Sequence, residues 1–173
     1  MSHRDPLAHP APMIRRVYAY VAYRIGAGPD AEDITSEVFE RALRYRATYD
    51  PARGGPLPWL LGIAQRCIID RANERRLDHV EPERADDGIE AGTLLRLELG
   101  DALAQLKPQA RELIALRYGA DLKAKDIAQI VGLKTNAVEV ALHRALAELR
   151  EQLEQAPESR PAYPLSPRVD ASN

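Results

Sequence analysis

The sequence predicts an all-α fold in which two small helical domains are joined by a flexible linker. Alanine and leucine are abundant in the 173 residues, whereas there is one phenylalanine and one tryptophan, a composition that favours helices over sheets. Apolar residues recur at helical spacings on both sides of an acidic stretch, residues 81–92, whose single bulky apolar residue is Ile89. We therefore expect domains at 13–80 and 94–155, a linker at 81–93, and disordered proline-containing ends at 1–12 and 156–173.

The first domain is predicted to contain three helices. The first spans Met13 to Ile25, and its apolar face consists of Ile14, Val17, Tyr18, Val21, Ala22 and Ile25. Asp30 is a suitable N-cap for the second helix, which runs to about Tyr45 and turns Ile34, Val38, Ala42 and Tyr45 inward. The third runs from Trp59 to about Arg76 and buries Leu60, Ile63, Ala64, Cys67 and Ile68. Residues 47–58 contain Asp-Pro and Gly-Gly-Pro, so we expect a loop without regular structure there.

The second domain carries the spacing of a helix-turn-helix between Asp121 and Arg150. Ala128 is small enough to let two helices cross closely, and Gly132 can adopt the positive φ of a tight turn between them. Val138 and Leu142 lie one turn apart and would hold the second helix against the first. In DNA-binding proteins that second helix enters the major groove. An ordinary αα-hairpin has the same local pattern and remains open from this segment alone.

Composition and motifs exclude several classes of protein. Cys67 is the single cysteine, so no internal disulfide can form, and a reducing, cytoplasmic location is expected. No apolar run approaches the ~20 residues that cross a bilayer. The four histidines are scattered, and no metal-ligand spacing, phosphate loop or nucleophile motif occurs, so we expect no enzyme activity, cofactor or metal. The net charge of −2 also argues against a generally basic nucleic-acid binder.

Several motifs together resemble bacterial sigma factors, the promoter-recognition subunits of RNA polymerase. Residues 30–43, DAEDITSEVFERAL, resemble the second conserved region of the sigma-70 family. Residues 59–64, WLLGIA, followed by Asp70 and a basic run, resemble the helix that reads the promoter −10 element. Residues 103–150, with LKP at 106, RELIALRY at 111, DIA at 126 and LHRA at 142, resemble the fourth region. Two such domains with only a short linker between them are typical of the extracytoplasmic-function (ECF) group, and the resemblance covers about residues 13–153.

The resemblance implies three binding surfaces and no catalytic residues, since RNA synthesis would belong to the polymerase. Core polymerase, through the clamp helices of its largest subunit, would bind Asp33, Glu37, Glu40 and Arg41. The −10 element would be opened and one unpaired base captured by Tyr49, Arg53, Trp59, Gln65, Arg66, Arg71 and Asn73. The −35 element would be read by Lys123, Lys125, Lys134, Thr135, Asn136, Glu139, Val140, His143 and Arg144. The polymerase flap would hold the second domain, and an anti-sigma factor is a further partner known in the family.

The reading helix departs from the family pattern, in which a serine cap is followed by threonine, valine, lysine, serine and arginine. Here the corresponding positions are Lys134, Ala137, Val138, Glu139, Val140 and Ala141. Glu139 places an anion opposite phosphates, which weakens backbone affinity, or alternatively accepts a hydrogen bond from cytosine N4. In the first domain Ser36 replaces a common glutamine on the core-docking helix, and Arg66 replaces a common asparagine in the −10 helix. Arg66 has more donors and a different shape, which would alter the preferred −10 base.

Two alternatives to a promoter-directing sigma factor remain open. One is a sigma-like adaptor that binds polymerase or an antagonist without reading a full promoter, an interpretation favoured by the altered reading helix. The other is a stand-alone helix-turn-helix regulator, although such regulators usually dimerise and no obvious dimerisation helix is present. For a sigma factor we expect weak DNA binding by the free protein, because polymerase would fix the spacing of the two domains.

Overall fold

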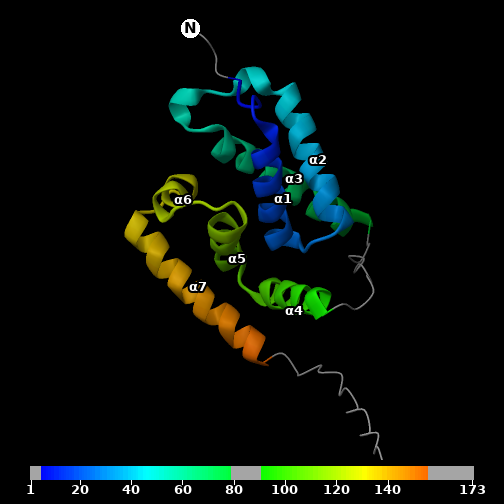
Figure 1. The fold of residues 1–173 in the computed structure, drawn as a ribbon, viewed down its shortest axis with the longest axis vertical. Coiled ribbons are helices and arrows are strands. Elements are labelled where there is room, and N and C mark those ends of the chain that lie inside the picture. Colours follow the sequence, from blue (N-terminus) through cyan, green and yellow to red (C-terminus); the bar gives the residue numbers. More distant parts are fainter. Residues whose placement is uncertain (1–4, 79–90, 156–173) are drawn as a thin grey trace, which may run out of the picture.

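The computed structural model describes residues 5–78 and 91–155, and every regular element in that part of the chain is helical (Figure 1). The prediction of an all-α fold is confirmed. The first half contains α1 (Pro10–Ile25), α2 (Pro29–Arg44), two 3₁₀ turns η1 (Arg46–Thr48) and η2 (Pro51–Arg53), and α3 (Pro56–Asp78). The second contains α4 (Ala91–Gln105), α5 (Pro108–Ile114), the π-helical turn η3 (Ala115–Gly119), α6 (Ala124–Val131) and α7 (Thr135–Gln155). None of these helices is both long and apolar enough to span a bilayer.

In the first half, α1, α2 and α3 pack around one apolar core. Its fully buried members include Val17, Tyr20 and Val21 of α1, Ile34, Val38 and Ala42 of α2, and Leu60, Ala64 and Cys67 of α3. The predicted inward positions Ile14, Ile25 and Tyr45 are wrong, because 42%, 38% and 49% of their surfaces are exposed. Burial on α1 is centred on Tyr20 instead, because the second half of the chain covers that side of the helix.

Two predictions of local structure in the first half are also corrected. Asp30 is not the N-cap of α2: Gly28 has that position with φ 133°, a conformation open to glycine, and Pro29 is the first helical residue. The segment 47–58 is not irregular throughout, because Asp50 accepts a hydrogen bond from the Ala52 N–H and starts η2. Proline is favoured in the first turn of a helix, and both α1 and α3 begin at a proline, Pro10 and Pro56. The start of α1 therefore lies within residues 1–12, which were expected to be disordered.

In the second half, α6 and α7 form the predicted helix-turn-helix. Gly132 has φ 70° and ψ 29°, and the N–H groups of Gly132 and Leu133 both donate to the Ala128 carbonyl. This left-handed cap ends α6 and satisfies a carbonyl that would otherwise lack a partner. Val138 is fully buried and Leu142 nearly so, as expected for the residues that hold α7 against α6. Farther along, Ala145 and Leu149 of α7 pack on Ala102, Leu103, Leu106 and Ile114.

The two halves are packed against each other, which the sequence did not lead us to expect. One continuous apolar cluster joins α1, α2 and α3 to Leu113, Leu116, Ala120 and Leu122 around η3 and to the helix-turn-helix residues Ile127 and Val138. The main contact is between α1 and η3, and α1 also touches α4 and α5. The predicted linker lies outside the described residues as far as residue 90, and its last three residues, 91–93, belong to α4.

Candidate functional site

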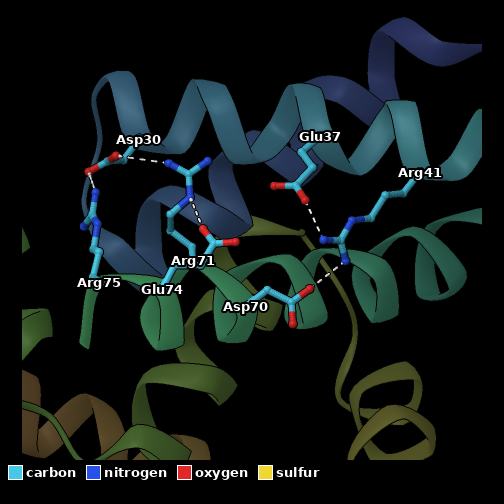
Figure 2. A network of polar contacts seen from close by, with 7 residues as sticks. All are labelled: Asp30, Glu37, Arg41, Asp70, Arg71, Glu74 and Arg75. Carbon is cyan, nitrogen blue, oxygen red and sulfur yellow. Dashed lines mark hydrogen bonds and ion pairs between the residues drawn. The ribbon is translucent and has the colours of Figure 1, made fainter. Parts of the chain in front are cut away.

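The exposed face of α2 carries the four residues predicted to bind polymerase. Asp33 and Glu40 are exposed, whereas Glu37 and Arg41 are half-buried because they are engaged with each other. Arg41 pairs with Glu37 at 2.6 Å, one helical turn away, and with Asp70 of α3 at 2.8 Å (Figure 2). The hydrogen bond to Asp70 raises the pKa of Arg41 above its ordinary value. Arg41 is thus a bridge between two helices, and Asp33 and Glu40 are the freer acidic groups of this face.

A second set of ion pairs joins the start of α2 to the end of α3. Asp30 pairs with Arg75 and lies 3.9 Å from Arg71, which is 3.8 Å from Glu74 (Figure 2). Exposed pairs of this kind each stabilise a fold by about 0–1 kcal/mol, so their importance is geometric. They fix α3, which carries most of the predicted −10 residues, relative to the predicted polymerase-binding helix. They also occupy Arg71, which the sequence presented as a free cation for DNA.

The predicted −10 residues come from the η1–η2 loop and from α3. Arg53, Gln65, Arg66 and Asn73 are exposed, and Trp59 is half-buried. Tyr49 is not a free stacking platform, because only 8% of it is exposed. Its ring packs on Trp59 with centroids 5.5 Å apart, and its hydroxyl donates to the Gly54 carbonyl at 3.1 Å. Tyr49 therefore supports Trp59 and the loop, and Trp59 is the more accessible of the two aromatic side chains.

All nine predicted −35 residues are exposed: Lys123 caps the start of α6, and the others lie on α6, on α7 and in the turn between them. The altered residue Val140 is 44% exposed, an apolar side chain directed outward among polar ones. Glu139 and His143 line a groove of about 600 Å³ together with Arg117 and Lys123. The carboxylate of Glu139 thus lies on a surface that also carries cations, and its charge does not make the reading surface uniformly acidic.

Sequence reasoning missed the residues through which the two halves of the chain are joined. Arg16, Tyr20 and Arg24 all contact the second half, and they are spaced four residues apart on one stripe of α1. The four-residue spacing places these three side chains on one face of the helix and could have indicated a contact surface. Two arginines on a helix, however, more often lie on a face exposed to solvent. Gly119 of η3, whose backbone meets α1, gave no signal of its own.

Cys67 provides a test of the first core. Burial, with a smaller effect of the carboxylate of Glu37, raises the pKa of its thiol to about 11, so the folded protein favours the neutral thiol. We expect iodoacetamide at pH 8 to label native protein at least 100-fold more slowly than protein in urea, given the rise of about two units above the ordinary 9.0. The free energy of unfolding should correspondingly fall as the pH rises from 9 towards 11. Equal labelling rates with and without urea would contradict the buried position.

Comparison of the sequence with known protein families identifies the family to which the chain belongs. The model of sigma-70 region 2 matches residues 12–77, and that of sigma-70 region 4 matches residues 96–149. The chain is 30% identical to the RNA polymerase sigma factor CarQ of Myxococcus xanthus over 86% of its own length and 87% of CarQ. The chain belongs to the sigma-70 family. It resembles ECF sigma factors in particular, with 32% identity to SigF of Caulobacter vibrioides over 82% of this chain and 81% of SigF.

Other relatives of this sigma factor differ in length or are similar mainly in fold. The ECF sigma factor BldN of Streptomyces coelicolor is 32% identical over 79% of this chain, which spans 56% of BldN. Among solved structures, the sigma factor RpoE in complex with the anti-sigma factor NepR from Bartonella quintana has a TM-score of 0.67 at 21% identity, covering 83% of this chain and 93% of RpoE. CnrH in complex with the cytosolic domain of CnrY has a TM-score of 0.60 at 23% identity, covering 86% of this chain and 84% of CnrH. These structures share the helical fold of this sigma factor.

Proposed function

We propose that this sigma factor binds core RNA polymerase and directs transcription initiation at promoters with specific −10 and −35 elements. One observation carries the proposal: a single chain contains both the region 2 match and the region 4 match, in that order and with an exposed reading helix in the second. In this proposal the protein supplies recognition, and the polymerase supplies catalysis.

In this proposal the first half of the chain binds polymerase and the −10 element, and the second half binds the −35 element. Asp33 and Glu40 on α2 would meet the clamp helices of the polymerase, while Arg41, paired with Glu37 on the same helix, holds α2 to Asp70 of α3. Trp59, supported by Tyr49, would stack on an unpaired −10 base while Arg53, Gln65, Arg66 and Asn73 hold the strand beside it. The exposed face of α7 would enter the major groove of the −35 element, where the exposed cations Lys134 and Arg144 would contact phosphates and bases.

An antagonist protein is a further proposed partner. RpoE and CnrH, which share this fold, were each solved with a bound protein: an anti-sigma factor for RpoE and the cytosolic domain of CnrY for CnrH. An anti-sigma factor that covered the α2 face would compete directly with polymerase for Asp33 and Glu40. In a binding experiment, polymerase and the anti-sigma factor would then each displace the other from this protein.

The adaptor function is kept as a second candidate because of one observation. Val140 and Glu139 give the exposed face of α7 an apolar and an acidic residue, where a DNA-reading helix usually carries polar and basic ones. An adaptor would use this face for a protein contact and would bind polymerase without starting transcripts.

Transcription from genomic DNA by core polymerase, with and without the purified protein, tests the proposed function. We expect discrete start sites that share a −10 motif and an upstream motif. Glu139→Gln and Val140→Ala variants should then alter the preference at one upstream position each, by about 1–3 kcal/mol for a direct base contact. Polymerase binding without any start site would favour the adaptor. Absence of polymerase binding would instead favour a free-standing regulator.

A further inference from the structure

A cleft of about 640 Å³ lies between segments that are far apart in the sequence. Arg53 of η2 and Trp59 of α3 line it from the first half of the chain, and Asp126 and Gln129 of α6 line it from the second. Its apolar lining also comes from both halves and includes Met13, Leu57, Leu61, Leu116, Leu122 and Ile130. Cavities of about 300–1,000 Å³ at junctions of this kind are typical sites for small molecules.

Several polar side chains that line the cleft already have partners within the protein. Arg16 donates two hydrogen bonds, of 2.7 and 2.9 Å, to backbone carbonyls just beyond η3. Glu112 accepts a hydrogen bond from the Tyr20 hydroxyl at 2.9 Å and also pairs with Arg24. Three further side chains of the cleft bond to nearby backbone groups, namely Thr48, Tyr49 and Asp50. These five side chains are held in place and give the cleft its shape.

Four other polar side chains of the cleft make no hydrogen bond or ion pair with the groups described at residues 5–77 and 98–155. They are one cation, one carboxylate and two amides: Arg53, Asp126, Gln65 and Gln129. Trp59 is half-buried and adds a flat apolar surface beside them. A nucleotide has the matching chemistry, because its planar base stacks on an aromatic ring, its base edge carries donors and acceptors, and its phosphate is an anion.

The two polar residues of α6 favour one base over the others. Asp126 and Gln129 are three residues apart, so their side chains are neighbours on one face of the helix. A carboxylate has two acceptor oxygens and no donor. Guanine presents two adjacent donors, N1–H and the N2 amine, next to the acceptor O6, so a carboxylate and a neighbouring amide together match its Watson–Crick edge. Adenine, cytosine and uracil each place an acceptor beside their donor, where it would face the carboxylate.

We propose that this cleft binds a guanine nucleotide. The base stacks on Trp59, the carboxylate of Asp126 accepts from N1–H and the N2 amine, and the amide of Gln129 donates to O6. Arg53 pairs with the phosphate. Binding of the nucleotide does not depend on the proposed function. One consequence does rest on it: a bound nucleotide covers Trp59 and Arg53, which then cannot meet the −10 strand.

The test is a titration of the full-length protein with guanosine monophosphate (GMP) in the absence of polymerase. Calorimetry measures affinity and stoichiometry, and the emission of Trp59, the single tryptophan, reports whether the ligand enters the cleft. We expect one site per chain and a change in emission. The adenine, cytosine and uracil monophosphates should bind at least about 10-fold more weakly, because their edges leave Asp126 without a donor. Guanosine, which lacks the phosphate, should also bind about 10-fold more weakly.

Asp126→Asn is the central variant, because an amide replaces one acceptor by a donor. It should weaken GMP by about 10-fold or more and improve binding of xanthosine monophosphate, whose C2 carbonyl accepts a hydrogen bond where guanine has an amine. This gain of binding cannot arise from misfolding. Glu151→Gln makes the same change of carboxylate to amide on α7, outside the cleft, and should bind GMP as the wild type does.

Arg53→Ala provides a second variant in case Asp126→Asn folds poorly. Since Arg53 contacts the phosphate, its removal should lower the affinity for GMP to that for guanosine and leave the affinity for guanosine unchanged. Circular dichroism and urea unfolding check the fold of each variant. A loss of affinity for both ligands in folded Arg53→Ala protein would contradict the assigned phosphate contact.

Three results would overturn the proposal. The first is the absence of heat and of any change in Trp59 emission at millimolar GMP. The second is equal affinity for the four monophosphates, which would remove the role of Asp126. The third is an equal loss of GMP affinity in Asp126→Asn and Glu151→Gln. Protein that binds GMP but not polymerase would refute the proposed function and leave the nucleotide site standing, and the reverse result would refute the nucleotide site alone.

Discussion

Reversing the charge of Asp33 and Glu40 on α2 is expected to abolish binding to core RNA polymerase while leaving the fold intact. Both side chains are exposed, and neither forms an ion pair with the side chains described at residues 5–77 and 98–155. Asp33→Arg with Glu40→Arg should therefore change the free energy of unfolding by about 1 kcal/mol or less. Like charges placed in an interface cost several kcal/mol, which weakens binding by about 100-fold or more. A titration of labelled polymerase measures this loss.

The control for that experiment has the same change in charge at a different place. Glu151→Arg with Glu154→Arg alters two exposed residues near the end of α7, far from α2 in the fold (Figure 1). We expect this control to bind polymerase nearly as well as the wild type. Equal losses in the two double variants would mean that net charge, and not the α2 face, determines binding. Glu37 is deliberately left unchanged, because its substitution would also free Arg41 from its pair.

Replacing Trp59 by alanine is expected to impair promoter opening without weakening polymerase binding. Stacking of a base on an aromatic side chain contributes about 1–3 kcal/mol, so Trp59→Ala should reduce the amount of open complex by about 5- to 150-fold. Permanganate reactivity of unpaired thymines in the −10 region measures the open complex. Trp59→Phe keeps an aromatic face against Tyr49 and should retain most of the activity.

A premelted template distinguishes the role of Trp59 from general loss of structure. If Trp59 acts by capturing a base as the strands part, a promoter with an unpaired −10 segment should restore part of the transcription by Trp59→Ala, because opening no longer has to be driven. Unchanged opening of duplex promoters by Trp59→Ala would exclude it from the −10 surface. A failure of Trp59→Ala to bind polymerase would point to a collapsed loop.

The parts of the structure that could be predicted were those set by neighbours in the sequence. Gly132, Val138 and Leu142 define the helix-turn-helix because a left-handed cap and a one-turn apolar spacing are local requirements. The helical content followed from the same kind of pattern, as did the exposure of the α7 reading face.

The parts that could not be predicted depend on contacts between distant residues. Asp30 has the chemistry of an N-cap, but Gly28 and Pro29 already start the helix, which leaves Asp30 to pair with Arg71 and Arg75 of α3. In the sequence Tyr49 lies in a polar, turn-rich segment, which suggests an exposed aromatic side chain. The intervening turns bring its ring against Trp59, ten residues away, and this contact is not visible in the sequence. The packing of Tyr20 against Gly119 joins residues about a hundred positions apart, and nothing local to either of them indicates it.

The ion pairs between α2 and α3 have a consequence for how the −10 surface would respond to ionic strength. Arg71 and Arg75 are already neutralised by Asp30, and Arg71 also by Glu74. A phosphate that recruits one of these arginines displaces a carboxylate, which then gathers cations from solution as the DNA gives them up. Fewer ions are set free overall than the number of arginines suggests, and ion release is what makes DNA affinity depend on salt. The affinity of this surface for the promoter would therefore fall less steeply with salt concentration than the affinity of the same arginines without their carboxylate partners.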